Sequence, residues 1–137
     1  MTTINKIKIA HSDNRREILE MFNGEFVAKQ IKIIKIKKGN ILGNHYHTYR
    51  ENCYVLSGKI KFYFEGIKTK EKGFFIMEEG DIILMEDFYA HAIESLEESI
   101  LVEGTEEVYD QKSDYVYKLK WYQFVHPFLM ETKKSMY

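Results

Sequence analysis

Cysteine and proline are almost absent from this sequence, which has one of each, Cys53 and Pro127, among 137 residues. A single cysteine cannot form an internal disulfide, and a chain of this length needs no disulfide framework to build a core. The sequence therefore favours a reducing, cytoplasmic setting.

An excess of charge of one sign and a long apolar run are also missing. The 20 lysines and arginines oppose 21 aspartates and glutamates, a formal net charge of -1, so no basic field indicates a nucleic-acid partner. Residues 1–10 alternate lysine with isoleucine, and we expect neither a signal peptide nor a membrane span.

Hydrophobic residues at 45% and aromatic residues at 15% are enough for one folded domain with a single core. Apolar and polar residues alternate with the period of a strand over residues 6–9 and 60–64. Over residues 27–38 the alternation changes phase between Ile33 and Ile34, which predicts a β-bulge or a strand covered on both faces. Residues 14–22 fit a helix or an irregular strand. Further strands are expected over residues 51–56, 74–77, 81–85, 91–95 and 99–103, and short strands with glycine between them favour a barrel or sandwich.

A set of five residues with a characteristic spacing lies in the middle of the chain: Gly39, His45, His47, Glu51 and Gly58. Two residues that are two apart on a strand project to the same face, so the imidazoles of His45 and His47 would lie about 7 Å apart along the chain. Glu51 follows a three-residue turn and can point to the same interior.

This spacing is that of the first motif of the cupin superfamily, which the chain resembles over about residues 25–107. The second motif is degenerate: Gly80 and His91 are kept, whereas Glu86, Phe88 and Ser95 replace the usual proline, glycine and asparagine. The resemblance implies an all-β, single-domain cupin barrel, also called a double-stranded β-helix or jelly roll. Residues 1–24 would form an N-terminal strand and turn that pack on the barrel. The aromatic extension of residues 108–137 would close the barrel or contact a second subunit of a homodimer.

The candidate metal ligands are the three histidines and the glutamate of the two motifs: His45, His47, Glu51 and His91. Three imidazoles and a carboxylate suit one divalent transition metal, such as zinc, iron, manganese or nickel, with positions left for water or substrate. A metal-free catalytic or sugar-binding pocket is the alternative.

Residues 43–64 and 106–119 resemble the cupin domains of sugar-nucleotide modification in polysaccharide biosynthesis and, more distantly, keto-sugar isomerases and epimerases. The resemblance implies a small-molecule substrate that is an activated carbohydrate. A histidine, His45 or His47, would remove the acidic proton next to the sugar carbonyl, and a tyrosine, for which alternation favours Tyr49, would stabilise the enediolate.

Arginines are the candidate ligands for the diphosphate of such a substrate: Arg15, Arg16 and Arg50. The first two belong to a stretch, Asp13 to Arg16, that lacks the glycine of the Asp-x-Arg-Gly turn found in those isomerases. Two other functions stay open, an Fe(II)-dependent dioxygenase and a non-catalytic module that binds a metal or a sugar.

Overall fold

The computed structural model describes residues 3–6, 8–110, 112 and 115–116, and these form strands and turns. The strands are β1 Thr3–Lys6, β2 Lys8–Ser12, β3 Glu17–Glu20, β4 Gln30–Ile36, β5 Ile41–Tyr46, β6 Glu51–Ser57, β7 Lys59–Gly66, β8 Lys72–Glu78, β9 Asp81–Met85, β10 Tyr89–Ser95, β11 Ser99–Thr105 and β12 Tyr115–Val116. Among the described residues no helix has the length and apolar character of a membrane span.

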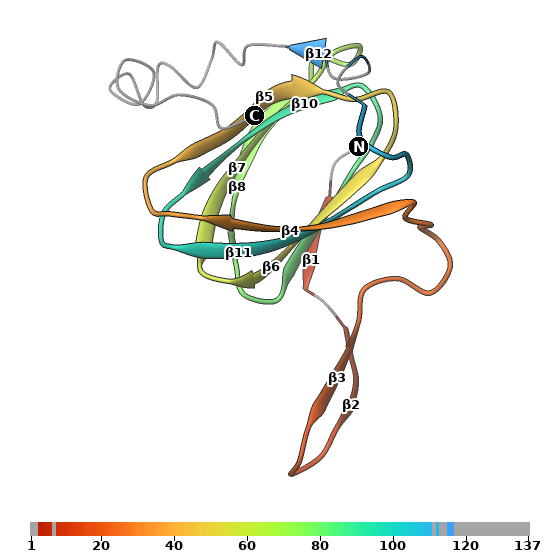
Figure 1. The fold of residues 1–137 in the computed structure, drawn as a ribbon, viewed down its shortest axis with the longest axis vertical. Helices are drawn as coiled ribbons and strands as arrows, with labels where there is room; N and C mark the ends of the chain where they lie inside the picture. Colours follow the sequence, from red (N-terminus) through yellow and green to blue (C-terminus); the bar gives the residue numbers. More distant parts are fainter. Residues whose placement is uncertain (1–2, 7, 111, 113–114, 117–137) are drawn as a thin grey trace.

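Two five-stranded antiparallel sheets enclose the core (Figure 1). The strand order is β1-β9-β6-β11-β4 in the first sheet and β12-β5-β10-β7-β8 in the second. Side chains that alternate along each strand point inward from both sheets and pack together, among them Val55, Phe62, Met77 and Leu101. Cys53 and Met85 belong to the same cluster. The expected all-β jelly-roll barrel is confirmed.

The strand β4 runs without the predicted bulge, because its register with β11 is continuous from Gln30 to Ile36. Ile34 and Ile36 face the core, whereas Ile31 and Ile33 point away from it and are exposed. Apolar residues therefore lie on both faces of β4. On the outer face Ile31 lines a small pocket with Phe22 and Phe26, but Ile31 and Ile33 stay largely exposed.

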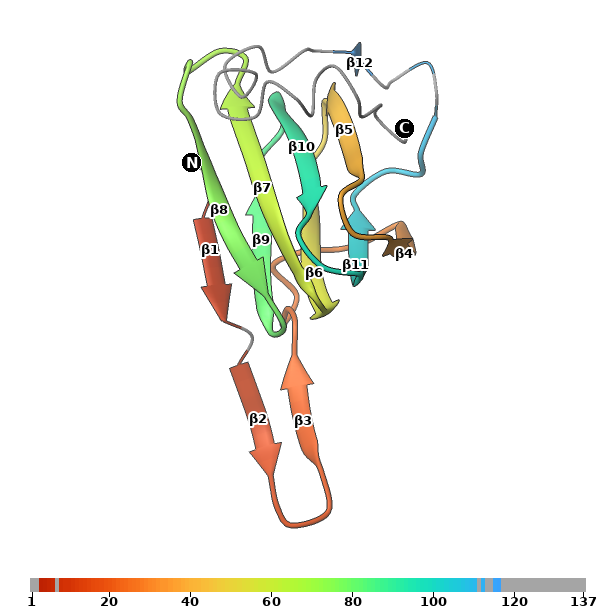
Figure 2. The same ribbon diagram turned by 90° about the vertical axis from the view of Figure 1, so that its left-hand side faces the viewer.

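Residues 14–22, which the sequence left open between helix and strand, contain β3. This strand pairs with β2 in a hairpin that forms a separate two-stranded sheet. Figures 1 and 2 show this hairpin projecting beyond one end of the barrel. Of the predicted aromatic extension, only residues 108–110, 112 and 115–116 are described, and Tyr115 and Val116 pair with β5.

Three connections meet at the opposite end of the barrel, formed by residues 47–50, 86–88 and 105–107, which we call the cleft end. The amide of Phe88 donates to the carbonyl of His47 over 2.8 Å, and the amide of Glu106 donates to the carbonyl of Arg50 over 3.2 Å. These backbone bonds hold together the loops that carry the candidate site.

Candidate functional site

His45 and His91 face each other across neighbouring strands of the second sheet. They are register partners on β5 and β10, and their Nε2 atoms lie 3.0 Å apart. A bulge next to this pair sets the direction of both rings, because Gly43 and Asn44 take positive φ angles of 96° and 66° where the register shifts. Local backbone geometry thus brings the two histidines into contact.

His47 and Glu51 enter the same interior from the two sides of the turn at residues 48–50. Glu51 Oε1 lies 3.3 Å from His91 Nε2, and Glu51 Oε2 lies 3.9 Å from His47 Nε2. All four side chains are buried, with 2–6% of their surface exposed. The structure therefore brings together the four residues that the sequence selected, and we call them the histidine cluster.

Burial holds the pKa of His91 well below its usual value of 6.5, and the neighbouring His45 and His47 lower it further. His91 is therefore a neutral imidazole at neutral pH.

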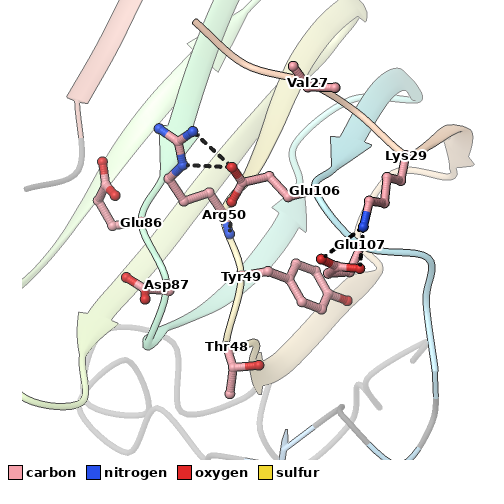
Figure 3. Close-up of a pocket in the computed structure, with 9 residues that line it drawn as sticks. All are labelled: Val27, Lys29, Thr48, Tyr49, Arg50, Glu86, Asp87, Glu106 and Glu107. Atoms are coloured by element: carbon pink, nitrogen blue, oxygen red, sulfur yellow. Dashed lines mark hydrogen bonds and ion pairs between the residues drawn. The ribbon is translucent and has the colours of Figure 1, made fainter.

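Tyr49 connects the histidine cluster to an open cleft of about 700 Å³. Its ring stacks on that of His47, with centroids 4.8 Å apart and planes within 11°. Tyr49 is also one of the residues that line the cleft, together with Val27, Lys29, Thr48, Arg50, Glu86, Asp87, Glu106 and Glu107 (Figure 3). A molecule in the cleft would therefore meet Tyr49, whose ring lies against that of His47.

Both cations of the cleft are paired with carboxylates. The Nε and Nη2 atoms of Arg50 donate to Glu106 Oε2 over 3.1 and 2.8 Å, and the Arg50 amide donates to Glu106 Oε1 (Figure 3). This hydrogen bonding raises the pKa of Arg50 and lowers that of Glu106. Lys29 pairs with Glu107 over 3.1 Å. An anionic ligand would have to compete with these carboxylates.

Arg15 and Arg16 do not reach the cleft of their own chain. They lie at the tip of the β2–β3 hairpin, where the Asp13 carboxylate accepts hydrogen bonds from the Arg15 guanidinium and from both backbone amides. These hydrogen bonds, with that of His11, lower the pKa of Asp13 to about 2. The arginine turn is therefore an organised structure, but on the hairpin and not at the site.

Sequence reasoning missed the buried carboxylate of Glu103 on β11. Its neighbours two positions away on the strand are Leu101, in the core, and Thr105, and it is paired in register with Cys53 and Lys32. Lys32 Nζ lies 4.0 Å from Glu103 Oε1. Alternation along residues 99–105 could have placed Glu103 inside, although a single glutamate in a strand is usually solvated.

Burial raises the pKa of Glu103 from 4.5 to about 7, and the ammonium of Lys32 offsets part of this effect. The folded state thus disfavours the ionised carboxylate, so stability from this group is complete below pH 4.5 and is lost as pH rises through 7. We expect Glu103→Gln to remove this dependence. The free energy of unfolding should then fall between pH 4.5 and pH 8 by roughly 1–3 kcal/mol less in the variant than in the native protein. Urea denaturation of both proteins at the two pH values measures the difference, and an equal pH dependence in the two would contradict it.

The donor types of the histidine cluster suit a divalent metal, but their arrangement places His45 and His91 in direct contact. Among the described residues, no group of three or more histidine, cysteine, aspartate or glutamate side chains is arranged to hold a metal ion. A cation would need the Nε2 lone pairs of both histidines, so their mutual hydrogen bond would have to break.

The two facing antiparallel sheets, with the histidine cluster in the interior, place the protein in the cupin class of β-barrels. A family model described as the polysaccharide biosynthesis C-terminal domain matches residues 11–117. The chain belongs to this family. A search of curated proteins finds no match to the sequence.

Solved structures of sugar-nucleotide enzymes share the fold. A dTDP-6-deoxy-D-glucose-3,5-epimerase from Legionella pneumophila, in complex with dTDP-4-keto-L-rhamnose, is 17% identical with a TM-score of 0.73 over 84% of this chain and 71% of its own. A 3,4-ketoisomerase from Helicobacter canadensis is 14% identical with a TM-score of 0.75 over 90% and 96%. The 3,4-ketoisomerase QdtA from Thermoanaerobacterium thermosaccharolyticum, in complex with TDP, is 14% identical with a TM-score of 0.72 over 93% and 95%. At these identities the likeness establishes the fold.

Proposed function

We propose that this protein is an isomerase or epimerase of nucleotide-linked keto sugars that works by proton transfer next to the carbonyl. The observation that carries the proposal is the contact of Tyr49 with both sides of the site: it stacks on His47 and lines the cleft. The family and the activities of the solved relatives support the same substrate class.

His47 is the histidine best placed to act as the base. It adjoins Tyr49 at the cleft, whereas His45 and His91 are hydrogen-bonded to each other deeper in the barrel. A hydrogen on the carbon beside a sugar carbonyl is acidic because the resulting negative charge moves to the carbonyl oxygen. His47 would take this proton, and the Tyr49 phenol would donate a hydrogen bond to the enediolate oxygen. Return of the proton by His47 to the neighbouring carbon gives an isomer with the carbonyl moved. An epimer forms when a second donor, such as water, delivers a proton to the opposite face and His47 keeps the one it removed.

Arg50 is the candidate that would hold the diphosphate at the cleft, and Glu106 is its competitor. We expect Glu106→Gln to release the guanidinium and to lower the dissociation constant for dTDP by about threefold to tenfold, equivalent to about 0.7–1.4 kcal/mol. Isothermal titration calorimetry measures this change, with Glu107→Gln as a control that releases the more exposed Lys29. Weaker binding to Glu106→Gln than to the native protein would mean that Glu106 positions Arg50 for the ligand.

The divalent metal stays a prediction from the donor types. If the prediction holds, protein purified without added metal contains about one zinc, iron, manganese or nickel ion per chain, and the His91→Ala variant loses this ion. Elemental analysis with matched thermal unfolding curves measures both. Native protein that is metal-free and active would contradict the metal prediction. The acid–base mechanism would be unaffected, because it needs no metal.

Three functions are separated by one set of assays with TDP-4-keto-6-deoxyglucose as the probe. An isomerase or epimerase converts the sugar to a product of the same mass, which proton NMR identifies. A dioxygenase loaded with Fe(II) consumes oxygen with an organic substrate. A binding module is stabilised by the sugar nucleotide against heat without turnover. We expect the first result.

A further inference from the structure

A small apolar pocket lies on the outer face of the first sheet, between the strands β6 and β11 and the segment that joins β3 to β4. We call this segment, residues 21–29, the connector. The pocket has a volume of about 200 Å³ and is lined by Met21, Phe22, Phe26, Ala28, Ile31, Asn52, Val102 and Gly104. None of these side chains is charged, and that of Asn52 is the polar one. The pocket therefore suits a neutral molecule.

The side chain of Asn52 lacks a hydrogen-bond partner. Neighbouring residues of a strand point to opposite faces, so Asn52 points away from Glu51 and the histidine cluster. Asn52 is only 4% exposed, and its Oδ1 atom accepts no hydrogen bond from any described residue. Buried polar atoms nearly always have a partner, because leaving one without it costs free energy. A ligand that donates a hydrogen bond would supply the missing partner.

Gly104 leaves space beside this amide. It is the register partner of Asn52 on β11, and a Cβ atom at this position would lie 2.8 Å from Asn52 Nδ2. At the next outward-facing pair along the two strands, Val102 and Tyr54 both carry side chains that pack together. The hollow in the sheet surface therefore lies at the Asn52–Gly104 pair, where the amide can reach a ligand.

The connector supplies two aromatic rings to the same pocket. Phe22 and Phe26 stack with their centroids 5.2 Å apart and their planes within 28°. Aromatic side chains of this kind favour a further ring as a neighbour. An apolar cavity of about 150 Å³ can hold one benzene molecule, so the volume of this pocket fits a single ring with a small substituent.

We propose that this pocket binds a neutral aromatic molecule of one ring, whose hydroxyl or N–H group donates a hydrogen bond to Asn52 Oδ1. The ring of the ligand packs against the two phenylalanines of the connector, and its donor group points to the floor of the pocket beside Gly104. The absence of charged lining residues excludes phosphate or carboxylate groups from the ligand. This site does not depend on the proposed activity.

The connector forms a wall of both this pocket and the cleft. Phe26 and Ala28 line the pocket, whereas the alternate residues Val27 and Lys29 line the cleft (Figure 3). The guanidinium carbon of Arg50, another residue of the cleft, lies 5.6 Å from the centre of the Phe26 ring. A molecule in the pocket therefore holds the connector against the sheet, and with it one wall of the cleft.

Phenol and toluene are a matched pair of probes, because they have similar size and shape but only phenol donates a hydrogen bond. Phenol titrated into ¹⁵N-labelled protein should shift the amide NMR signals of Phe26, Ala28, Asn52 and Gly104 saturably, with a dissociation constant of about 1 mM or tighter. Hydrogen exchange at the connector amides should slow as phenol binds. No saturable binding, saturable shifts confined to other residues, or unchanged exchange in the connector would each contradict the proposal.

Two variants separate the hydrogen bond from the apolar contacts. Asn52→Leu replaces an unpartnered buried amide by an apolar group of similar shape, so the variant should fold. It should weaken phenol binding about tenfold and leave toluene bound at least as tightly as before. Ala28→Leu keeps the amide but fills the pocket, and should abolish binding of both probes.

Circular dichroism confirms that both variants are folded. Equal effects of Asn52→Leu on phenol and toluene, or native affinity for both in Ala28→Leu, would overturn the proposed site.

Discussion

Replacing His47 with glutamine is expected to lower kcat for a keto-sugar nucleotide by about 10²–10⁴-fold, the usual contribution of a general base. Glutamine keeps a polar side chain of similar length but cannot accept a proton at neutral pH. The affinity for dTDP should change little, because the proposed diphosphate ligand is Arg50 on the other side of Tyr49. Turnover followed by NMR and dTDP binding followed by calorimetry separate the two effects.

A matched control comes from His11, which lies on the β2–β3 hairpin and contacts Asp13 instead of the histidine cluster. His11→Gln should retain the native rate. If His45→Gln lost activity while His47→Gln kept it, the base would be His45, the other histidine that the sequence proposed, and the assignment made from the Tyr49 contact would be wrong.

Gly43→Ala is expected to cost the most stability of any single methyl addition at the site, about 3 kcal/mol or more. The residue has φ of 96°, and a Cβ atom there would lie 2.6 Å from the carbonyl oxygen of His91 and 3.1 Å from Ala92 Cα. Both are backbone atoms, so β5 and β10 would have to separate. The His45–His91 hydrogen bond spans these two strands, so activity should fall together with stability.

Gly24→Ala is the matched control for Gly43→Ala. Gly24 has nearly the same φ, 94°, but a Cβ atom there meets nothing within 4 Å. The Gly24→Ala variant should therefore lose only about 1–2 kcal/mol of stability, the conformational cost of the left-handed region for a residue with a Cβ atom. Urea denaturation of both variants measures the difference. Equal losses would show that the close approach at Gly43 relaxes without cost.

The histidine cluster could be predicted from sequence because its geometry follows from short-range rules. His45, His47 and Glu51 lie within seven residues, where strand period and a tight turn determine which side chains share a face. His91 came from its motif position alone, and only the register of β10 against β5 shows why it arrives there.

Other parts of the site depend on where distant segments lie, which no local pattern contains. The arginines Arg15 and Arg16 were assigned to the substrate, but they lie at the tip of the β2–β3 hairpin, which projects away from the cleft of their own chain. The carboxylates Glu106 and Glu107 pair with the cations Arg50 and Lys29, which are far away in the sequence. No local pattern predicts these two ion pairs. The phase change at Ile33 predicted a bulge or a strand covered on both faces. The structure has neither, because the register of β4 is continuous and its outer residues Ile31 and Ile33 are exposed.

The central claim, that the histidine cluster exchanges a proton next to a sugar carbonyl, is tested most directly in deuterium oxide. TDP-4-keto-6-deoxyglucose is incubated with the native protein, and the hydrogens on the carbons beside the carbonyl are followed by NMR. The account predicts enzyme-dependent deuterium at one of these carbons, absent with His47→Gln. Native protein that binds the sugar nucleotide but leaves those hydrogens unexchanged, as in the protein-free sample, would contradict it.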